Sequence, residues 1–256
     1  MNGRIVLVTG AASGIGAATV ERLAADGATV LAFDRDAQAL QALSAQTGAT
    51  AFVGDVTQQA DIDAAMAALH GLGGLDVVVN GAGVVAADDP QDVTDAVWER
   101  MLSINLTGTM RVCRGAIPLL KARGGGAIVN VASVAAFNST PGSASYAPSK
   151  AAVVAFTRNL AYALGSDGIR ANCVCPGWTR TPMAEREMTE MAELAGTTME
   201  AQFAIMADRI ALKRVALPHE IANCIRFLAS DEASFVTGAA LVADGGGRVA
   251  THARGF

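Results

Sequence analysis

A tyrosine and a lysine four residues apart have the clearest capacity for proton transfer in this chain. Tyr146 and Lys150 lie in the stretch SASYAPSK (143–150), and residues at this spacing share one face of an α-helix. A free tyrosine ionises at about pH 10 and is a poor base at neutral pH. Because a nearby ammonium favours the phenolate, we expect Lys150 to lower the pKa of Tyr146 and make it a usable general acid or base. Taken alone, the pair also fits an ordinary helix start.

A glycine-rich turn near the start of the chain could hold a phosphate. The stretch TGAASGIG (9–16) places Gly10, Gly14 and Gly16 between an apolar run and an amphipathic segment. Glycines there permit positive φ angles and let the backbone approach a pyrophosphate at a helix N-terminus. The spacing G-x-x-x-G-x-G differs from the general dinucleotide fingerprint G-x-G-x-x-G, so the turn alone indicates dinucleotide binding only weakly.

Acidic residues follow the next two apolar runs. Asp34 closes the second run, where a carboxylate can accept hydrogen bonds from the adenosine ribose of a dinucleotide. It would repel the 2′-phosphate of NADP, which favours NAD, although Arg35 could turn toward such a phosphate and keeps dual use open. Asp34 could instead cap a helix. Asp55 is expected beside the adenine or, equally, as a cap for the segment that starts at Thr57.

The elements that position these residues alternate along the chain. Short β-branched runs predict strands over 4–8, 29–33, 50–54, 75–80, 127–132, 170–175 and 239–244. Alanine-rich segments predict helices over about 15–26, 36–46, 57–70, 92–121, 146–165 and 218–229. The runs are almost continuously apolar, as in a parallel sheet covered by helices on both faces. No linker or repeat interrupts them, so we predict one domain over residues 1–256.

One segment breaks the alternation. Residues 183–213 contain five of the nine methionines among acidic residues and no strand pattern. One reading is a pair of surface helices, or a single one, with methionine filling gaps in the packing. The other is a mobile substrate lid over an apolar ligand, because long insertions in compact domains are usually functional.

Composition narrows the class of protein. A net charge of −5, a pI of about 5.2 and the lack of any basic cluster argue against a nucleic-acid partner. The four cysteines (113, 173, 175 and 224) have no metal-ligand spacing, and we expect Cys173 and Cys175 on opposite faces of a strand as reduced thiols. The histidines are scattered, so no metal site is predicted. The start of the chain lacks a signal-peptide pattern, and polar residues and prolines interrupt the uncharged run 124–149. We expect a soluble, cytoplasmic protein without membrane contact.

Taken together, the motifs resemble the short-chain dehydrogenase/reductase family from about residue 4 to residue 246. The matching pieces are TGAASGIG (9–16), Asp34, GDV (54–56), NGAG (80–83), Asn105 in SINLTG, Ser133 in IVNVAS, Tyr146 with Lys150, PGWTRT (176–181), TG (237–238) and DGG (244–246). Their order and spacing carry the resemblance. One departure is Gly81, where the family usually has a second asparagine that helps to pin the central sheet.

The resemblance implies a fold and a catalytic tetrad. The fold is a single Rossmann-like, doubly wound, seven-stranded parallel sheet with helices on both faces. In the tetrad, Tyr146 is the general acid/base and Ser133 holds the substrate oxygen. Lys150 supports the tyrosine and binds the nicotinamide ribose. Asn105 holds a water for a proton relay through its backbone or its side chain.

The resemblance also implies where cofactor and substrate bind. Expected cofactor contacts are Gly10, Ser13, Gly14, Ile15, Gly16, Asp34, Asp55, Val56, Asn80, Ala82, Gly83, Tyr146, Lys150, Pro176, Gly177, Thr179 and Thr181. Asn80 is expected near the adenine ribose. Expected substrate contacts are Ser133, Val134, Tyr146, Trp178 and Met183, within a pocket lined by residues 134–140, Trp178 and residues 183–206. Trp178 could equally be a packing anchor for that segment. Arg180 and Arg186 are the cations that could serve an anionic substrate.

The function implied is an NAD-dependent short-chain alcohol dehydrogenase or ketone reductase. It transfers a hydride between NAD(H) and a small-molecule secondary alcohol or ketone. Two alternatives stay open, an NADPH-dependent carbonyl reductase of the 3-oxoacyl type and a non-catalytic dinucleotide-sensing protein. The family implies a homotetramer or dimer, and we expect the tail 248–256 to pack at a subunit interface.

Overall fold

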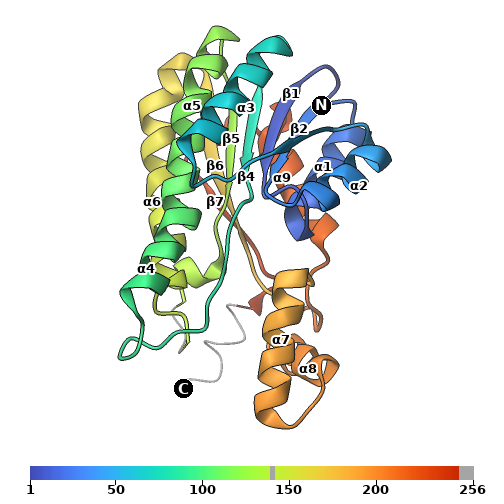
Figure 1. Cartoon of the computed structure of the whole chain (residues 1–256), viewed down its shortest axis with the longest axis vertical. Coiled ribbons are helices and arrows are strands. Elements are labelled where there is room, and N and C mark those ends of the chain that lie inside the picture. Colours follow the sequence, from blue (N-terminus) through green and yellow to red (C-terminus); the bar gives the residue numbers. More distant parts are fainter. Residues whose placement is uncertain (139–141, 248–256) are drawn as a thin grey trace.

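A seven-stranded parallel sheet is the centre of the computed structural model, which describes residues 1–138 and 142–247 (Figure 1). Within those residues the strand order is β3-β2-β1-β4-β5-β6-β7. Its strands are β1 (Ile5–Thr9), β2 (Thr29–Asp34), β3 (Thr50–Val53), β4 (Val77–Asn80), β5 (Gly126–Val131), β6 (Ile169–Pro176) and β7 (Ala240–Ala243). The chain winds outward from β1 to β3 and then returns to β4, so the order reverses between β1 and β4. Ligands of open parallel sheets bind at such a reversal, beyond the carboxyl ends of the strands.

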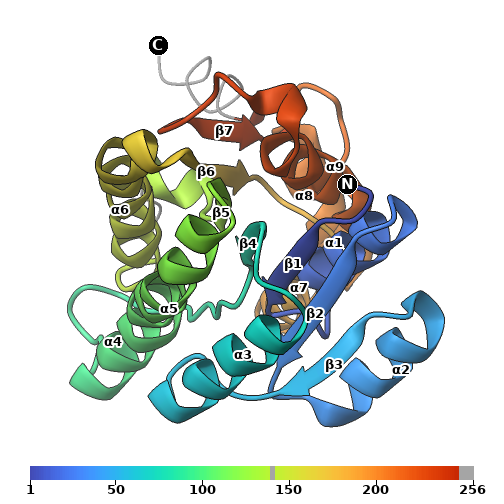
Figure 2. The same ribbon diagram turned by 90° about the horizontal axis from the view of Figure 1, so that it is seen from above.

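Helices cover both faces of the sheet (Figure 2). One face carries α1 (Gly14–Ala25), α2 (Ala37–Thr47) and α9 (Pro218–Ala229); the other carries α3 (Gln59–Gly71), α5 (Thr109–Ala122) and α6 (Tyr146–Leu164). Strand β1 shows why its run is continuously apolar. Ile5 and Leu7 pack into the cluster formed with α3, α5 and α6, whereas Val6 and Val8 pack into the cluster formed with α1, α2 and α9. The doubly wound fold expected from the sequence is therefore confirmed.

The region expected to form one helix over 92–121 contains a break. Helix α4 (Asp95–Leu102) is followed by the π-helical turn η1 (Ser103–Gly108) and then by α5. Thr94 caps α4 by accepting a hydrogen bond from the backbone N–H of Val97 at 3.3 Å, which explains the later start. A π-turn adds a residue to the helical ring, and such turns occur frequently at functional sites. The apolar periodicity does not distinguish it from an α-helix.

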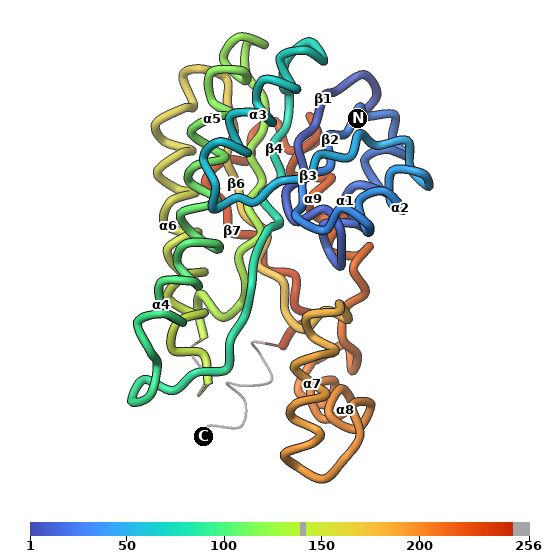
Figure 3. The backbone as a smooth tube through the Cα atoms, viewed as in Figure 1, coloured from blue at the N-terminus to red at the C-terminus, as the bar shows by residue number. Residues whose placement is uncertain are grey.

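The segment 183–213 folds mainly as two packed helices, α7 (Pro182–Ala195) and α8 (Met199–Asp208). They extend beyond the edge of the sheet at which the chain leaves β4, β5 and β6 (Figure 3). Their shared cluster buries Ala184, Met188, Phe203 and Met206. Methionines thus do fill the packing between two helices, and movement of this α7–α8 unit as a lid stays a prediction.

The cysteine prediction was wrong in one respect. Cys173 and Cys175 share one buried cluster on β6, because residues two apart on a strand point to the same face. Their thiols hydrogen-bond to each other, which lowers the pKa of Cys173 and, with burial, raises that of Cys175. Burial also raises the pKa of Cys113 to about 12. The cysteines at 113, 173, 175 and 224 are free thiols.

Among the described helices none is long and apolar enough to cross a membrane.

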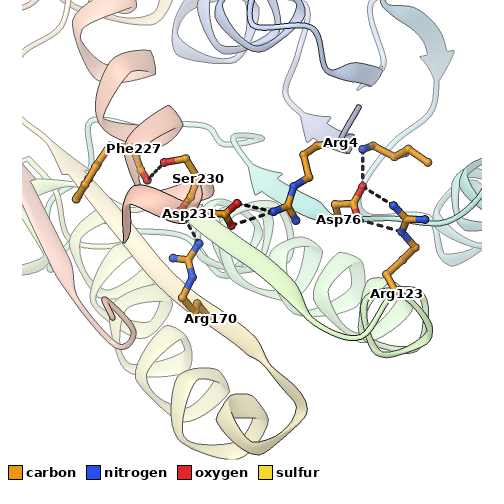
Figure 4. A network of polar contacts seen from close by, with 8 residues as sticks. Arg4, Asp76, Arg123, Arg170, Phe227, Ser230 and Asp231 are labelled. Atoms are coloured by element: carbon orange, nitrogen blue, oxygen red, sulfur yellow. Dashed lines mark hydrogen bonds and ion pairs between the residues drawn. The ribbon is translucent and has the colours of Figure 1, made fainter. Parts of the chain in front are cut away.

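A polar network ties the strands together at the end of the sheet opposite the carboxyl edge (Figure 4). The buried carboxylate of Asp76 accepts hydrogen bonds from the backbone N–H of Ile5 at 2.7 Å and from Arg123 Nε at 3.0 Å. Arg170 donates to carbonyls at the end of α9, 2.8 Å from Leu228 O. Arg4 and Asp231 form a more exposed pair at 2.9 Å. The network therefore has one ion pair with a buried carboxylate, Asp76, and one with an exposed carboxylate, Asp231.

Asp76→Ala is expected to lower the free energy of unfolding by about 2–4 kcal/mol, because it leaves a buried N–H unsatisfied and Arg123 unpaired. Asp231→Ala is the matched control. Its carboxylate is 84% exposed, so the loss should not exceed about 1 kcal/mol. Urea unfolding of both variants measures the difference, and equal losses would contradict the assignment.

Candidate active site

Residues from four elements converge at the carboxyl edge of the sheet. Ser133 follows β5 and begins the short turn η2 (Val134–Ala136), while Tyr146 and Lys150 lie in the first turns of α6. Asn105 comes from the π-turn η1. The helix pattern of SASYAPSK thus positions two of these residues, and the end of a strand positions a third.

Ser133 and Tyr146 are joined by a hydrogen bond between their hydroxyls. Ser133 Oγ also accepts a hydrogen bond from the backbone N–H of Ala135 at 3.1 Å, which fixes its rotamer. The two hydroxyls therefore present one polar spot at the sheet edge. A substrate oxygen placed there would contact both.

The pKa of Tyr146 differs from the sequence expectation. Burial raises it to about 12; the hydrogen bond from Ser133 partly opposes this, and the negative charge of Glu187 adds to it. Lys150, whose Nζ lies 5.8 Å from the centroid of the Tyr146 ring, does not reverse this rise. In the protein without a dinucleotide, loss of solvation thus outweighs the charge of Lys150. The expected lowering of the Tyr146 pKa stays a prediction for the complex, in which the positive nicotinamide ring adds its charge.

Lys150 is buried below the tyrosine. Its side chain is 5% exposed, and its Nζ donates a hydrogen bond to the carbonyl of Val131 at 2.9 Å. Burial lowers its pKa to about 8. A Cβ added to Gly83 would lie 3.3 Å from both Lys150 Nζ and Asn105 Oδ1. Glycine at 83 thus keeps the space beside the ammonium open.

Asn105 uses its side chain for structure. Its Oδ1 accepts a hydrogen bond from Val84 N at 2.8 Å, and its Nδ2 donates to Val84 O and to Ser149 Oγ, each at 3.0 Å. The side chain therefore has little capacity left to hold a water. Its backbone carbonyl, in the π-turn, accepts a hydrogen bond from Thr109 Oγ1 at 2.9 Å. A carbonyl oxygen can accept a second hydrogen bond, so the backbone keeps more capacity to hold a water than the side chain does. The water relay itself stays a prediction.

The glycine turn has the shape of a phosphate cradle. Gly10 has φ of 66°, and a Cβ there would lie 2.6 Å from the backbone N of Ala82. A Cβ on Gly16 would lie 1.9 Å from the carbonyl oxygen of Gly10. Ser13 precedes α1 without capping it through its side chain, which leaves the helix N-terminus open to an anion. Ile15, half-buried, packs toward the core.

The two acidic residues after β2 and β3 differ in their surroundings. The half-buried carboxylate of Asp34 accepts hydrogen bonds from Ala12 N at 3.0 Å and Asp36 N at 3.1 Å, so it borders the glycine turn. Asp55 Oδ1 accepts a hydrogen bond from Thr57 N at 2.8 Å. As in the capping alternative, the Asp55 carboxylate accepts a hydrogen bond from a backbone N–H two residues later. It caps a turn and not the helix, because α3 begins only at Gln59.

The side chains of two expected cofactor residues point elsewhere. Asn80 is 3% exposed, and its Nδ2 donates to Asn130 Oδ1 at 2.8 Å within the core, so its side chain does not reach toward a ribose. Val56 is also buried, and a Cβ added to Gly108 would lie 2.8 Å from its Cγ2. Both side chains are therefore held in the core, so a cofactor contact of either residue would come from its backbone, and both contacts stay predictions.

The loop after β6 closes over the glycine turn. A Cβ on Gly14 would lie 3.1 Å from Thr181 Cγ2. Thr181 caps α7 by accepting a hydrogen bond from Ala184 N at 3.2 Å. Earlier in the loop, Pro176 is the last residue of β6, and Gly177 packs against Asp244. Thr179 is buried, and its Oγ1 donates a hydrogen bond to the carbonyl of Gly177 at 3.1 Å. Of the expected contacts in this loop, Thr181 therefore borders the glycine turn.

The expected substrate residues are only partly brought together. Val134 lies next to Ser133, and Met183 lies in the first turn of α7. Trp178 packs against the buried cluster of the α7–α8 unit, which supports the packing-anchor alternative. The expected pocket residues 139 and 140 and the tail 248–256 lie outside the described part of the chain.

Sequence reasoning missed two acidic residues near the tyrosine. Asp88, in the loop after β4, accepts a hydrogen bond from the backbone N–H of Ser145 at 3.1 Å and another from its hydroxyl. It thereby ties that loop to the residue before Tyr146. Glu187, on α7, raises the pKa of Tyr146 through its negative charge. Neither belongs to a recognisable motif, and only its place in the fold marks it.

Comparisons with known proteins agree with this geometry. Residues 10–247 match the family described as enoyl-(acyl carrier protein) reductase. A cis-4-hydroxycyclohexanecarboxylate dehydrogenase from Sinomonas cyclohexanicum is 40% identical over 249 residues, which cover 95% of this chain and 96% of that protein. A 3-oxoacyl-(acyl-carrier-protein) reductase from Thermotoga maritima is 35% identical over 252 residues, covering 96% and 98%. The chain belongs to the short-chain dehydrogenase/reductase family.

The solved structures show the same fold for this short-chain dehydrogenase/reductase. The crystal structure of a variant actinorhodin polyketide ketoreductase with NADPH has a TM-score of 0.90 and 33% identity, covering 95% of this chain and 96% of that one. The protein is therefore an oxidoreductase that acts on an alcohol or ketone with a nicotinamide dinucleotide.

Proposed function

We propose that this protein is an NAD-dependent dehydrogenase of secondary alcohols, and reductase of the matching ketones, with Tyr146 as the general acid/base. The observation that carries the proposal is the hydrogen-bonded pair of Ser133 and Tyr146 hydroxyls at the carboxyl edge of the sheet, with Lys150 buried below it. Direct proton transfer requires the side chain to lie within hydrogen-bond distance of the substrate oxygen, and a substrate oxygen at this pair would meet that condition.

The roles follow from the contacts of each residue. Ser133 Oγ, fixed by Ala135 N, orients the substrate oxygen, and the Tyr146 hydroxyl gives or takes the proton. With a pKa of about 12 in the protein alone, Tyr146 keeps its proton at neutral pH, which suits it to donate during ketone reduction. As a base in alcohol oxidation it needs further positive charge beside the phenol, of which Lys150 supplies a part. When bound, the dinucleotide supplies the hydride acceptor and a positively charged ring.

The residues present fit a nicotinamide dinucleotide. The cradle at Gly10 and Gly16 leaves room that a Cβ would fill, and the N-terminus of α1 has no side-chain cap. These would hold the pyrophosphate. Asp34 would accept hydrogen bonds from the adenosine ribose, and Lys150 and the backbone of Thr179 would hold the nicotinamide end.

The choice of NAD over NADP rests on Asp34. Its carboxylate borders the glycine turn, where it opposes a 2′-phosphate by charge repulsion. Arg35 is exposed and next in the chain, so it is the residue that could favour NADP instead. The alternative of an NADPH-dependent 3-oxoacyl-type reductase draws support from one relative's name and from NADPH in the ketoreductase structure. A sensing protein without catalysis would need no hydrogen-bonded proton donor, which argues against that reading.

Asp34→Ser is expected to raise kcat/KM with NADP⁺ relative to NAD⁺ by at least about tenfold, because a like-charge repulsion disappears. Steady-state rates with both cofactors and one secondary alcohol measure this ratio. Asp36→Ser is the control, since Asp36 is exposed and caps α2 at Ala39 N, 3.0 Å away, so its ratio should stay at the parental value. A parental enzyme that prefers NADP⁺ would overturn the NAD assignment.

We further propose a cytoplasmic homotetramer or dimer. A fully exposed phenylalanine, Phe235, between α9 and β7 supports a subunit contact near that edge of the sheet. The mass in solution decides between the two assemblies.

A further inference from the structure

Asp88, in the loop after β4, joins that loop to the chain that enters α6. Its backbone N–H donates a hydrogen bond to the carbonyl of Gly142 at 3.2 Å, and its carbonyl accepts one from the backbone N–H of Ala144 at 3.3 Å. Its carboxylate accepts two more from Ser145, through Oδ1 from the backbone N–H at 3.1 Å and through Oδ2 from the hydroxyl. One residue therefore holds the segment that leads directly into Tyr146.

The Ser145 end of these contacts is buried. Ser145 is 0% exposed, and Asp88 is half-buried. Ser145 precedes the first residue of α6, yet its hydroxyl does not cap the helix and donates to Asp88 instead. Buried N–H and O–H groups need acceptors, and hydrogen bonds to a carboxylate are about twice as strong as those between neutral groups. The carboxylate therefore fixes both the backbone and the side chain of the residue before the tyrosine.

The same loop also holds α6 on the other side of the tyrosine. Ser149 Oγ donates a hydrogen bond to the carbonyl of Tyr146 at 2.7 Å and accepts one from Asn105 Nδ2 at 3.0 Å. Asn105 in turn exchanges hydrogen bonds with the backbone of Val84, in the loop after β4. The turn that carries Tyr146 is thus held after the tyrosine through Asn105 and before it by Asp88.

The position of the tyrosine depends on such contacts from outside its helix. Tyr146 is the first residue of α6, and the first four N–H groups of a helix have no partner within it. Its hydroxyl is hydrogen-bonded to that of Ser133, which follows a different element, β5. A misplacement of about 1 Å in a reacting group can cost about 10²-fold in rate. Contacts that fix the start of α6 therefore bear directly on proton transfer.

We propose that Asp88 is a positioning residue: acting through Ser145, it holds the Tyr146 hydroxyl where the substrate oxygen must lie. Both oxygens of its carboxylate are used on Ser145, so the proposal requires no contact between Asp88 and the substrate or the dinucleotide. Its removal should therefore slow the chemical step and leave cofactor affinity unchanged. This inference rests on the proposed dehydrogenase function and adds a residue that acts through the general acid/base.

The first test replaces Asp88 and its neighbour. The substrate is the secondary alcohol that the parental enzyme oxidises fastest with NAD⁺ in a panel of cyclic and open-chain alcohols. Asp88→Ala should lower kcat by about 10²-fold and leave KM for NAD⁺ within about twofold. Asp88→Asn should stay within about fivefold of the parental kcat, because its amide can accept from the Ser145 N–H and donate to the Ser145 hydroxyl. Asp89→Ala is the matched control and should keep the parental kcat, since Asp89 is exposed and its carboxylate accepts from Gln91 N, 3.0 Å away within the loop.

The second test asks whether Asp88 acts through the tyrosine. In a Tyr146→Phe background no hydroxyl remains to be positioned, so Asp88→Ala should lower the residual rate by less than about threefold. A general structural role would lower the rate by the same factor in both backgrounds. Ser145→Ala removes the hydroxyl contact but keeps the backbone one, and it should repeat the pattern with a smaller loss. This milder variant serves if Asp88→Ala does not fold.

The outcomes separate this claim from the proposed function. The positioning role is overturned by a parental kcat in Asp88→Ala, by equal losses in the two backgrounds, or by a loss as large in Asp88→Asn or Asp89→Ala. A parental enzyme inactive on every secondary alcohol and ketone with either cofactor overturns the proposed function itself. Amide hydrogen exchange at Ser145, which should be faster in Asp88→Ala than in Asp89→Ala, would then still report whether Asp88 holds the start of α6.

Discussion

Tyr146→Phe is expected to lower kcat by about 10²–10⁴-fold, the usual contribution of a positioned general acid or base. Phenylalanine keeps the ring that packs beside Lys150 but has no hydroxyl to donate to or accept from a substrate oxygen. The affinity for NAD⁺ should stay close to the parental value, because the glycine turn and Asp34 are untouched. Stopped-flow or steady-state rates give kcat, and titration of protein fluorescence gives the dissociation constant of the dinucleotide.

The other tyrosine of the chain provides the control for this prediction. Tyr162 lies on the same helix, α6, and is 95% exposed. Tyr162→Phe should therefore leave kcat within about twofold of the parent. Full retention of activity in Tyr146→Phe would show that another group moves the proton. Equal losses in both variants would indicate a general effect on α6 and not a catalytic hydroxyl.

Much of this architecture was predictable because its signals are local. Each buried strand is a short apolar run, and β1 shows the reason, since Val6 and Val8 face one helical layer while Ile5 and Leu7 face the other. The positive φ at Gly10 and the tight packing at Gly16 explain why the turn has glycine at these two positions. The pairing of Tyr146 with Lys150 required only helical spacing. In each case a few neighbouring residues contain the information.

What the sequence could not predict depends on residues far apart in the chain. The π-turn at 103–108 leaves the apolar pattern unchanged, and its Asn105 is held by Val84 across 21 positions. The Asn80 side chain points into the core because it donates a hydrogen bond to Asn130, and no sequence pattern pairs these two residues. Burial of the tyrosine and the charge of Glu187 raise its pKa in the protein without a dinucleotide. Such effects arise only once helices and strands pack.

Gly16→Ala should lower kcat/KM by about 100-fold or more, although alanine is the better helix former. Its Cβ would lie 1.9 Å from the carbonyl oxygen of Gly10 and 3.2 Å from Ala11 Cα, and both of these atoms belong to the backbone of the cradle. The turn must shift by more than about 1 Å to relieve the first contact, and a misplacement of that size can cost about 10²-fold. Most of the loss should be in KM for NAD⁺, because Gly16 lies at the proposed pyrophosphate site.

A glycine-to-alanine substitution in another helix separates the steric clash at Gly16 from the higher helix propensity of alanine. Gly71, in the last turn of α3, has no atom within 4 Å of an added Cβ. Gly71→Ala should therefore stabilise the fold by up to about 1 kcal/mol and leave the kinetics unchanged, because only the backbone-entropy term remains. Thermal unfolding and dinucleotide titration of both variants measure the contrast. If Gly16→Ala also bound NAD⁺ as the parent does, the turn would not be the pyrophosphate cradle, and the cofactor would have to be held by the loop after β6 alone.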